Sequence, residues 1–287
     1  MPLAPAFPPA PAAAGCARLL APAYQRLVTL CPALDVQVAA LRSRIGPDWV
    51  DGAELAADGG VLDAFLAAEA ARILNRDQHV ARPDVVASRA LHGYLWSVCL
   101  LMSGPWYLRR RVPLLRPRDI RIDPGTGALA VVPGAFTCLS DDPAAGMTAV
   151  RVVADAAALR AALLTTVTDH VRPLLAALGP HLRRGPRALW GMVGDDLISG
   201  IWHLGRALGE EERAVRLAGE LLPGPVPPFP GGADFRRLTD PAGGSRLTRT
   251  RLGCCLHYTV RPAETCGTCP RLTDTARLSP ADAVPGP

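Results

Sequence analysis

Apolar residues in the first third of the chain recur at the three- and four-residue spacing of an amphipathic helix. This spacing predicts helices over residues 17–44, with a break at Pro32, and over residues 60–75. A third helix is expected to begin at Pro83, because proline is tolerated in a first helical turn. Its apolar stripe should pack in the core, with Trp96 bordering a cleft.

The pattern changes from helical spacing to alternation between residues 113 and 153. Residues 120–122 and 128–132 flank a turn rich in glycine, which is typical of a β-hairpin, and residues 149–153 predict a further strand. Residues 125–130 match the G-x-G-x-x-A pattern of dinucleotide sites. In a true site this pattern opens a helix, whereas here it leads into a strand, so we do not expect a nucleotide there.

Helical spacing returns at residue 155, and it predicts helices over residues 155–178, 187–208 and 210–222. Residues 223–230 contain five prolines, which is typical of a stiff linker. The expected fold class is α+β. The expected division is a disordered leader at 1–16, a mostly helical body at 17–222 with a small antiparallel sheet at about 118–153, a linker at 223–244, a four-cysteine module at 245–279, and a disordered tail at 280–287.

Composition is that of a soluble globular protein, with 49% hydrophobic and 20% charged residues among 287. A chain of this length can bury a substantial core. All 31 basic residues are arginine, and the net charge of +5 suits an anionic partner without indicating nucleic acid.

The apolar N-terminus has no basic region and contains many prolines, so we interpret it as a disordered leader rather than a signal peptide. A lipoprotein signal ending at Cys16 is the alternative. The apolar run at 85–102 is interrupted by Arg89 and His92, which favours a buried helix over a membrane span. We therefore expect a cytoplasmic protein without membrane insertion.

Four of the eight cysteines lie close together near the C-terminus in the pattern C-C-x10-C-x-x-C. They are Cys254, Cys255, Cys266 and Cys269. In a reducing compartment such a set favours metal binding over disulfides. Neighbouring cysteines in an extended chain point to opposite sides, which suits a single zinc ion poorly. A [2Fe–2S] cluster offers two metal atoms and takes four thiolates, so it is the preferred interpretation, with zinc and disulfides as alternatives.

Other polar groups have simpler interpretations. His257 follows the cysteine pair, but four thiolates already complete a ligand set, so we expect it to be a neighbour. Asp195 and Asp196 are adjacent on a helix and face different directions, which favours a solvated helix face over a metal site or an acid–base pair. The remaining histidines show no metal-binding spacing.

A run of arginines at residues 109–111 follows Trp106 and Tyr107 and could contact an anionic partner. A charged loop beside the sheet is the preferred interpretation. Cys16, Cys31, Cys99 and Cys138 are scattered along the chain and are expected to be small buried thiols.

The cysteine pattern, with Tyr258 three residues after the pair and Arg246, Arg249 and Arg251 before it, resembles the C-terminal domain of the FhuF-like ferric siderophore reductases. Two weaker similarities lie at residues 81–96 and 189–194. At the second, Met192 stands where the family has asparagine, and Gly194 and Asp195 stand where it has alanine and serine.

The resemblance implies a [2Fe–2S] enzyme that transfers single electrons to Fe³⁺ in a siderophore of the hydroxamate type and releases Fe²⁺ in the cytoplasm. Its electrons would come from a donor protein or a small reductant, and no catalytic residue is assigned beyond the four cysteines. No nucleic-acid partner is expected. Two other functions stay open: a structural zinc module on a helical protein that binds nucleic acid or a partner, and an electron carrier or siderophore-assembly relative without reductase activity.

Overall fold

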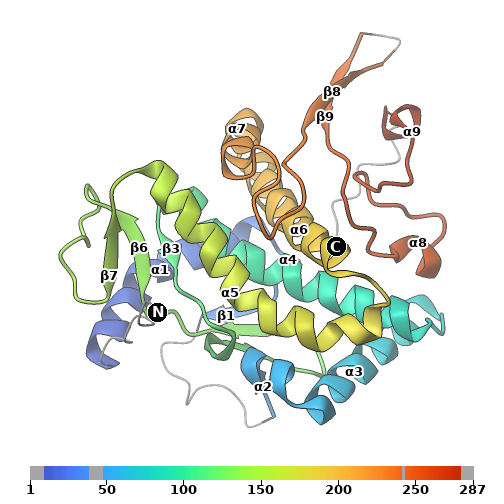
Figure 1. Ribbon diagram of the computed structural model, residues 1–287, viewed down its shortest axis with the longest axis horizontal. Helices are drawn as coiled ribbons and strands as arrows, with labels where there is room; N and C mark the ends of the chain where they lie inside the picture. The colour runs from blue at the N-terminus through green and yellow to red at the C-terminus, as the bar shows by residue number, and fades with distance from the viewer. Residues whose placement is uncertain (1–9, 39–47, 241–242, 279–287) are drawn as a thin grey trace. The chain divides into compact units, whose positions relative to one another are not determined.

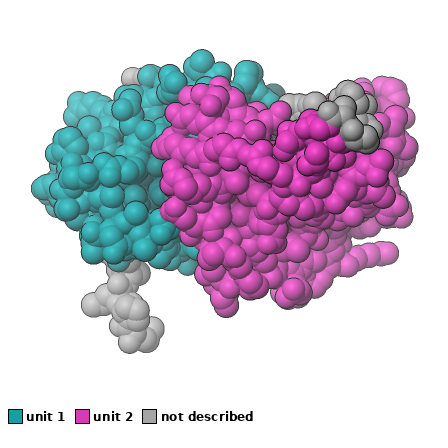
Figure 2. Space-filling view, turned by 90° about the horizontal axis from the view of Figure 1, so that it is seen from above, with its two compact units in different colours: residues 1–57, 101–174 teal, residues 58–100, 175–287 magenta. Residues whose placement is uncertain are grey.

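The computed structural model describes residues 10–38, 48–240 and 243–278 (Figure 1). The chain forms two compact units, which Figure 2 shows in two colours: residues 1–57 with 101–174, and residues 58–100 with 175–287. Two helices, α4 (Pro83–Arg109) and α5 (Ala156–Leu182), contribute residues to both units. Most of the predicted leader and all of the predicted tail lie outside the described residues.

The first unit begins with α1 (Ala10–Leu30), so the last residues of the predicted leader are helical. The helix predicted over residues 17–44 ends at Leu30, and its predicted continuation is wrong at residues 36–38, which form a strand. Residues 39–44 lie outside the described residues. The chain turns at Pro32 and enters β1 (Val36–Val38), which pairs in parallel with β5. Two β-branched valines alternate with Gln37 here, and pairing with a neighbouring strand prevails over the helical spacing of the apolar residues.

The first unit holds two small sheets. One has the strand order β1-β5-β4-β2 and includes the predicted hairpin of β4 (Ile120–Ile122) and β5 (Leu129–Val131). The other has the order β3-β6-β7, in which β6 and β7 are parallel. The remaining strands are β2 (Val50–Asp51), β3 (Val112–Pro113), β6 (Phe136–Leu139) and β7 (Val150–Val153); α2 (Gly52–Ala57) follows β2, and a short 3-10 turn, η2 (Pro117–Asp119), precedes β4.

The α+β class with a mostly helical body is confirmed, but the sheets are mixed rather than purely antiparallel. Residues 125–130 lie in the hairpin turn and β5, where Gly127 has a positive φ of 80°. They do not open a helix, which agrees with the rejection of a nucleotide site there.

The second unit is built around α6 (Pro186–Ala207), together with α3 (Gly59–Asp77) and α7 (Glu211–Leu221). The carboxylate of Asp58 caps α3 by accepting hydrogen bonds from the amides of Gly60 and Val61. The predicted end of α5 at Gly179-Pro180 is wrong, because the helix continues to Leu182. Leu178 and Leu182 are both buried one turn apart, and their packing keeps the last turn helical.

Helices α6 and α7 approach each other closely at Gly205. A Cβ atom on Gly205 would lie 2.2 Å from the Cβ of Ala214. Ala214, Ala218 and Leu221 form the buried face of α7. A glycine is therefore needed at this crossing so that the two helices can pack.

Substituting Gly205 by alanine is expected to lower the free energy of unfolding by about 1–3 kcal/mol, because the new methyl group forces the helices apart. Gly219 on α7 is the matched control, since a Cβ there would meet no atom of the described residues within 4 Å. Gly219→Ala should be neutral or slightly stabilising. Urea denaturation of both variants measures the difference, and equal midpoints would show that the crossing is not tight.

Helix α4 is long and apolar enough to cross a membrane by length and composition. However, 89% of its most apolar 18-residue window is buried inside the protein. This burial is typical of a core helix, and it agrees with the interpretation of this run as a buried helix.

The proline-rich segment after α7 packs on α6, which differs from the extended linker that its composition indicates. Phe229 is buried, and its ring makes an edge-to-face contact with Trp190 at 5.7 Å between centroids. A hairpin of β8 (Arg236–Thr239) and β9 (Ser245–Thr248) follows. The chain then passes through the cysteine segment with its two short helices, α8 (His257–Val260) and α9 (Asp274–Leu278).

Candidate metal centre

The four clustered cysteines lie in two loops of the second unit, one between β9 and α8 and the other between α8 and α9. Cys255 and Cys269 are buried, and Cys254 and Cys266 are half-buried. The Sγ atoms of Cys255 and Cys266 are 3.9 Å apart. This is close to the separation of about 3.8 Å that two thiolates have on one tetrahedral metal atom, and far from the S–S bond of about 2.05 Å.

The backbone bends at both cysteine pairs. Leu256 adopts a positive φ of 61° directly after Cys255, and its amide donates a hydrogen bond to Cys254. In the second pair, the amide of Cys269 donates to the carbonyl of Cys266 at 2.8 Å. The bend that neighbouring cysteines need in order to share a metal centre is therefore present in the fold.

Arg277 of α9 holds the second cysteine loop from inside. Its side chain is 2% exposed and donates hydrogen bonds to the carbonyls of Arg249 at 2.8 Å, Gly267 at 3.1 Å and Cys269 at 2.7 Å. The burial of Arg277 could not be predicted from the sequence, because the residue lies eight positions after Cys269 in a polar segment.

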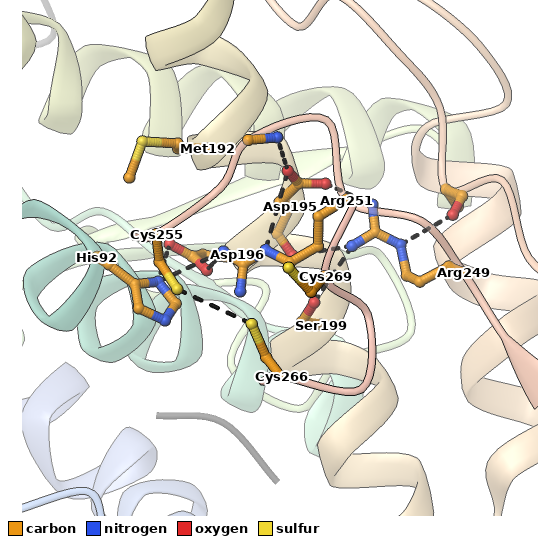
Figure 3. A network of polar contacts seen from close by, with 12 residues as sticks. His92, Met192, Asp195, Asp196, Ser199, Arg249, Arg251, Cys255, Cys266 and Cys269 are labelled. Carbon is orange, nitrogen blue, oxygen red and sulfur yellow. Dashed lines mark hydrogen bonds and ion pairs between the residues drawn. The ribbon is translucent and has the colours of Figure 1, made fainter. Parts of the chain in front are cut away.

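Asp195 and Asp196 are fully buried in α6, so the prediction of a solvated helix face is wrong. Both carboxylates receive arginines from the segment that leads into the cysteines (Figure 3). The two ion pairs are Arg249 with Asp195, at 2.8 Å, and Arg251 with Asp196. Burial costs each charge its hydration, and pairing with an opposite charge compensates for that cost.

Asp195 also fixes the backbone beside the cysteine pair. The amide of Gly253 donates to its carboxylate at 2.7 Å. Arg249 completes its own hydrogen bonding with Ser199 at 3.2 Å and the carbonyl of Ala233 at 3.0 Å. Burial raises the pKa of Asp195, while the two guanidinium groups and the Gly253 amide oppose that rise.

His92 of α4 joins the second pair. Its Nδ1 lies 2.9 Å from the Asp196 carboxylate and 3.4 Å from a nitrogen of Arg251. Burial pushes the pKa of Asp196 upward, but the charges of His92 and Arg251 outweigh it, and the net shift is downward. Asp196 is therefore held as a carboxylate beneath the cysteine loops.

Cations surround the sulfur atoms. The hydrogen bond from Cys266 is the main reason that the pKa of the Cys255 thiol is lowered, against the effect of its burial, and the charges of His92, Arg251 and Arg89 add to it. The same hydrogen bond and burial raise the pKa of Cys266. Burial raises the pKa of Cys254, and the nearby sulfurs of Cys255 and Cys269 raise it further. Neighbouring thiolates thus repel one another, and a cation that binds them relieves the repulsion.

The three segments that resemble the reductase family meet in this unit. Within α6, a Cβ on Gly191 would lie 3.2 Å from Leu252. A Cβ on Gly253 would lie 2.5 Å from the side chain of Met192. From α4, the charge of Arg89 helps to lower the pKa of Cys255, and His92 contacts Asp196. Trp96 lines a cavity beside Cys266, as predicted.

Other predicted positions take no part in the arginine–aspartate network described above. Arg110 and Arg111 pair with Asp141 and Asp142, and the neighbouring Trp106 is buried, which favours the charged-loop interpretation. His257 is half-buried and lies 3.9 Å from Glu264. The scattered thiols are buried, as expected: Cys16, Cys31, Cys99 and Cys138.

The donor set fits a thiolate-bound metal centre. The four sulfurs lie in two bent loops, two of them, those of Cys255 and Cys266, already have the separation of shared ligands, and Arg251 offsets the negative charge that a thiolate cluster carries. Among the described residues, no group of three or more His, Cys, Asp or Glu side chains is as closely drawn together as bound-metal ligands are. The class that this fold and this site define is a metalloprotein with thiolate ligands.

Residues 251–271 match the family model of the FhuF 2Fe-2S C-terminal domain. The match covers the cysteine segment, and it supports the assignment of the chain as an iron–sulfur protein of the FhuF type with a [2Fe–2S] cofactor. A search of curated proteins found no match. Cys254, Cys255, Cys266 and Cys269 are the residues that would hold the cluster.

Proposed function

We propose that this protein is a ferric siderophore reductase of the cytoplasm. The observation that carries the proposal is the FhuF-type 2Fe-2S segment, with its four thiolates in a setting rich in arginine. When bound, the cluster supplies single electrons: chelated Fe³⁺ gains one electron and becomes Fe²⁺, and a reduced donor, either a protein or a small reductant, loses one. Oxygen-rich chelators hold hard Fe³⁺ more tightly than Fe²⁺, so the reduction releases the metal.

The chain's own part is to place and tune the centre. Arg249 and Arg251 hold the residues that precede the cysteines against α6 through their ion pairs. Arg277 holds the end of the cysteine segment through its hydrogen bond to the carbonyl of Cys269. The guanidinium of Arg251 is buried beside Cys255 and Cys266. A buried cation next to the ligands favours the more negative, reduced state of the centre, and therefore raises its potential.

The half-buried positions of Cys254 and Cys266 leave one side of the centre near the surface. A chelate and an electron donor can therefore approach without opening the fold.

The experiment is a single-turnover reduction under anaerobic conditions. The purified protein is reduced with dithionite, freed of excess reductant and mixed with a ferric trihydroxamate and a strong Fe²⁺ trap. We expect about one trapped Fe²⁺ per cluster, together with the return of the visible absorption of the oxidised protein.

The control is the same reaction with cluster-free protein. Trapped iron no higher than this control would remove the reductase activity and leave an electron carrier. Stoichiometric zinc without inorganic sulfide in the freshly isolated protein would instead support the structural zinc module.

A further inference from the structure

A cavity of about 260 Å³ lies within the second unit, beside the cysteine loop. Its walls come from α4, α6, the β8–β9 hairpin and the C-x-x-C turn, which contributes Cys266. A molecule bound there would lie directly against one of the four thiolate ligands. The cavity is therefore placed where a reaction partner of the centre would bind.

Arginine side chains make up most of the charged lining of the cavity. Five arginines and one glutamate line it: Arg206, Arg237, Arg246, Arg251, Arg277 and Glu211. Carboxylates offset this charge: Asp195 and Asp196 lie against Arg251, Glu212 pairs with Arg237, Asp274 with Arg277, and Glu211 of the wall with Arg206. The buried Nε atoms of Arg251 and Arg277 have no hydrogen-bond partner among the described residues.

Two tryptophans give the cavity an apolar side. Trp96 is almost fully buried, and its ring meets that of His203 edge to face at 5.7 Å. The indole of Trp202 is fixed by a hydrogen bond to Glu211 at 2.8 Å, and the guanidinium of Arg206 lies over its ring at 5.6 Å. Such a surface suits the hydrocarbon spacer of a ligand that carries a negative charge.

We propose that this cavity binds a carboxylate-bearing arm of the ferric chelate, so that the protein prefers chelates of net negative charge. The inference rests on the proposed function and adds a charge class to its substrate. Pockets for whole ligands are usually about 300–1,000 Å³, so this cavity has room for one arm of a chelate rather than all of it. Arg206 and Arg237 are the more exposed arginines of the wall and would meet the carboxylate first.

The test uses one linear trihydroxamate in three forms: its terminal amine free, acetylated or succinylated. These chelates carry net charges of about +1, 0 and −1 around the same metal coordination, as ordinary amine and carboxylate pKa values require. Gallium(III) replaces Fe³⁺, since it is not reduced under these conditions, so that calorimetry of the holoprotein measures binding apart from electron transfer. We expect the anionic chelate to bind about tenfold more tightly than the cationic one at 50 mM salt, and this ratio to shrink at 500 mM.

The double variant Arg206→Gln/Arg237→Gln should reduce this preference to threefold or less. The matched control is Arg213→Gln/Arg216→Gln, two exposed positions on α7 that do not line the cavity, and it should keep the wild-type ratio. Equal affinity for the three chelates, absence of binding, or an unchanged ratio in the double variant would each overturn the inference.

Its failure is distinguishable from failure of the proposed function. Reduction of all three ferric chelates at the same rate, with no charge preference in binding, would support the reductase activity and contradict the carboxylate-binding site. Charge-dependent binding of the gallium chelates without any Fe²⁺ release would keep the site and remove the reductase.

Discussion

Replacing Arg251 with methionine is expected to lower the free energy of unfolding by about 3–5 kcal/mol, because it takes the arginine partner away from the fully buried carboxylate of Asp196. The segment that leads into Cys254 should detach from α6, and iron content should fall with it. Denaturant unfolding together with iron analysis of the holoprotein measures both effects.

Two further variants separate charge burial from general damage. Arg216→Met removes an exposed arginine of α7 and should change stability by less than about 0.5 kcal/mol. The double variant Arg251→Met/Asp196→Asn removes both charges, and it should recover part of the lost stability because the Asp196 carboxylate is no longer buried without its arginine. A single Arg251→Met variant as stable as wild type would show that the pair does not hold the segment.

Substituting Cys266 by alanine is expected to reduce iron and acid-labile sulfide from about two of each per chain to less than a tenth of that, because the cluster loses one of its four ligands. The visible absorption and the Fe²⁺ release should disappear with the cluster. Circular dichroism should still show the helical body, since Cys266 is half-buried in a loop and not part of the core.

Cys99 provides the matched control for this loss. It is fully buried in α4 of the same unit, outside the cysteine segment, and Cys99→Ala should retain iron and sulfide despite a modest loss of stability. A cluster that survives in the Cys266 variant, or is lost from the Cys99 variant, would contradict the ligand assignment.

The fold could be predicted from sequence where one local signal dominated. The helices around residues 60–75 and 187–208 have regular apolar spacing, and the hairpin at 120–131 has an alternating pattern around a glycine turn. Val36–Val38 was missed because a three-residue strand depends on a partner far away in the chain, which no local pattern reveals. The end of α5 was missed because packing of Leu182 sustains the helix beyond Pro180.

The cysteines were recognisable because their residue type and spacing carry the chemistry directly. The arginine–aspartate network was not, since a rule about adjacent helix positions made Asp195 and Asp196 look solvated. A better signal was present: α6 is apolar on all sides around these two residues, which is typical of a central helix. Two acids inside such a helix need buried cations, and Arg249 and Arg251 were the nearest clustered basic residues to the cysteines.

The docking of the cysteine segment onto α6 and α4 affects how it can be inherited. His92, Asp195 and Asp196, the residues that receive it, lie well before it in the chain, and α4 itself runs through both units. A gene rearrangement that moved residues 245–278 alone would carry Arg249 and Arg251 without the aspartates that pair with them. The turn at the cysteine pair would lose the helices on which it packs. The iron-binding end of this chain should therefore pass between lineages only together with the helices that carry those acids.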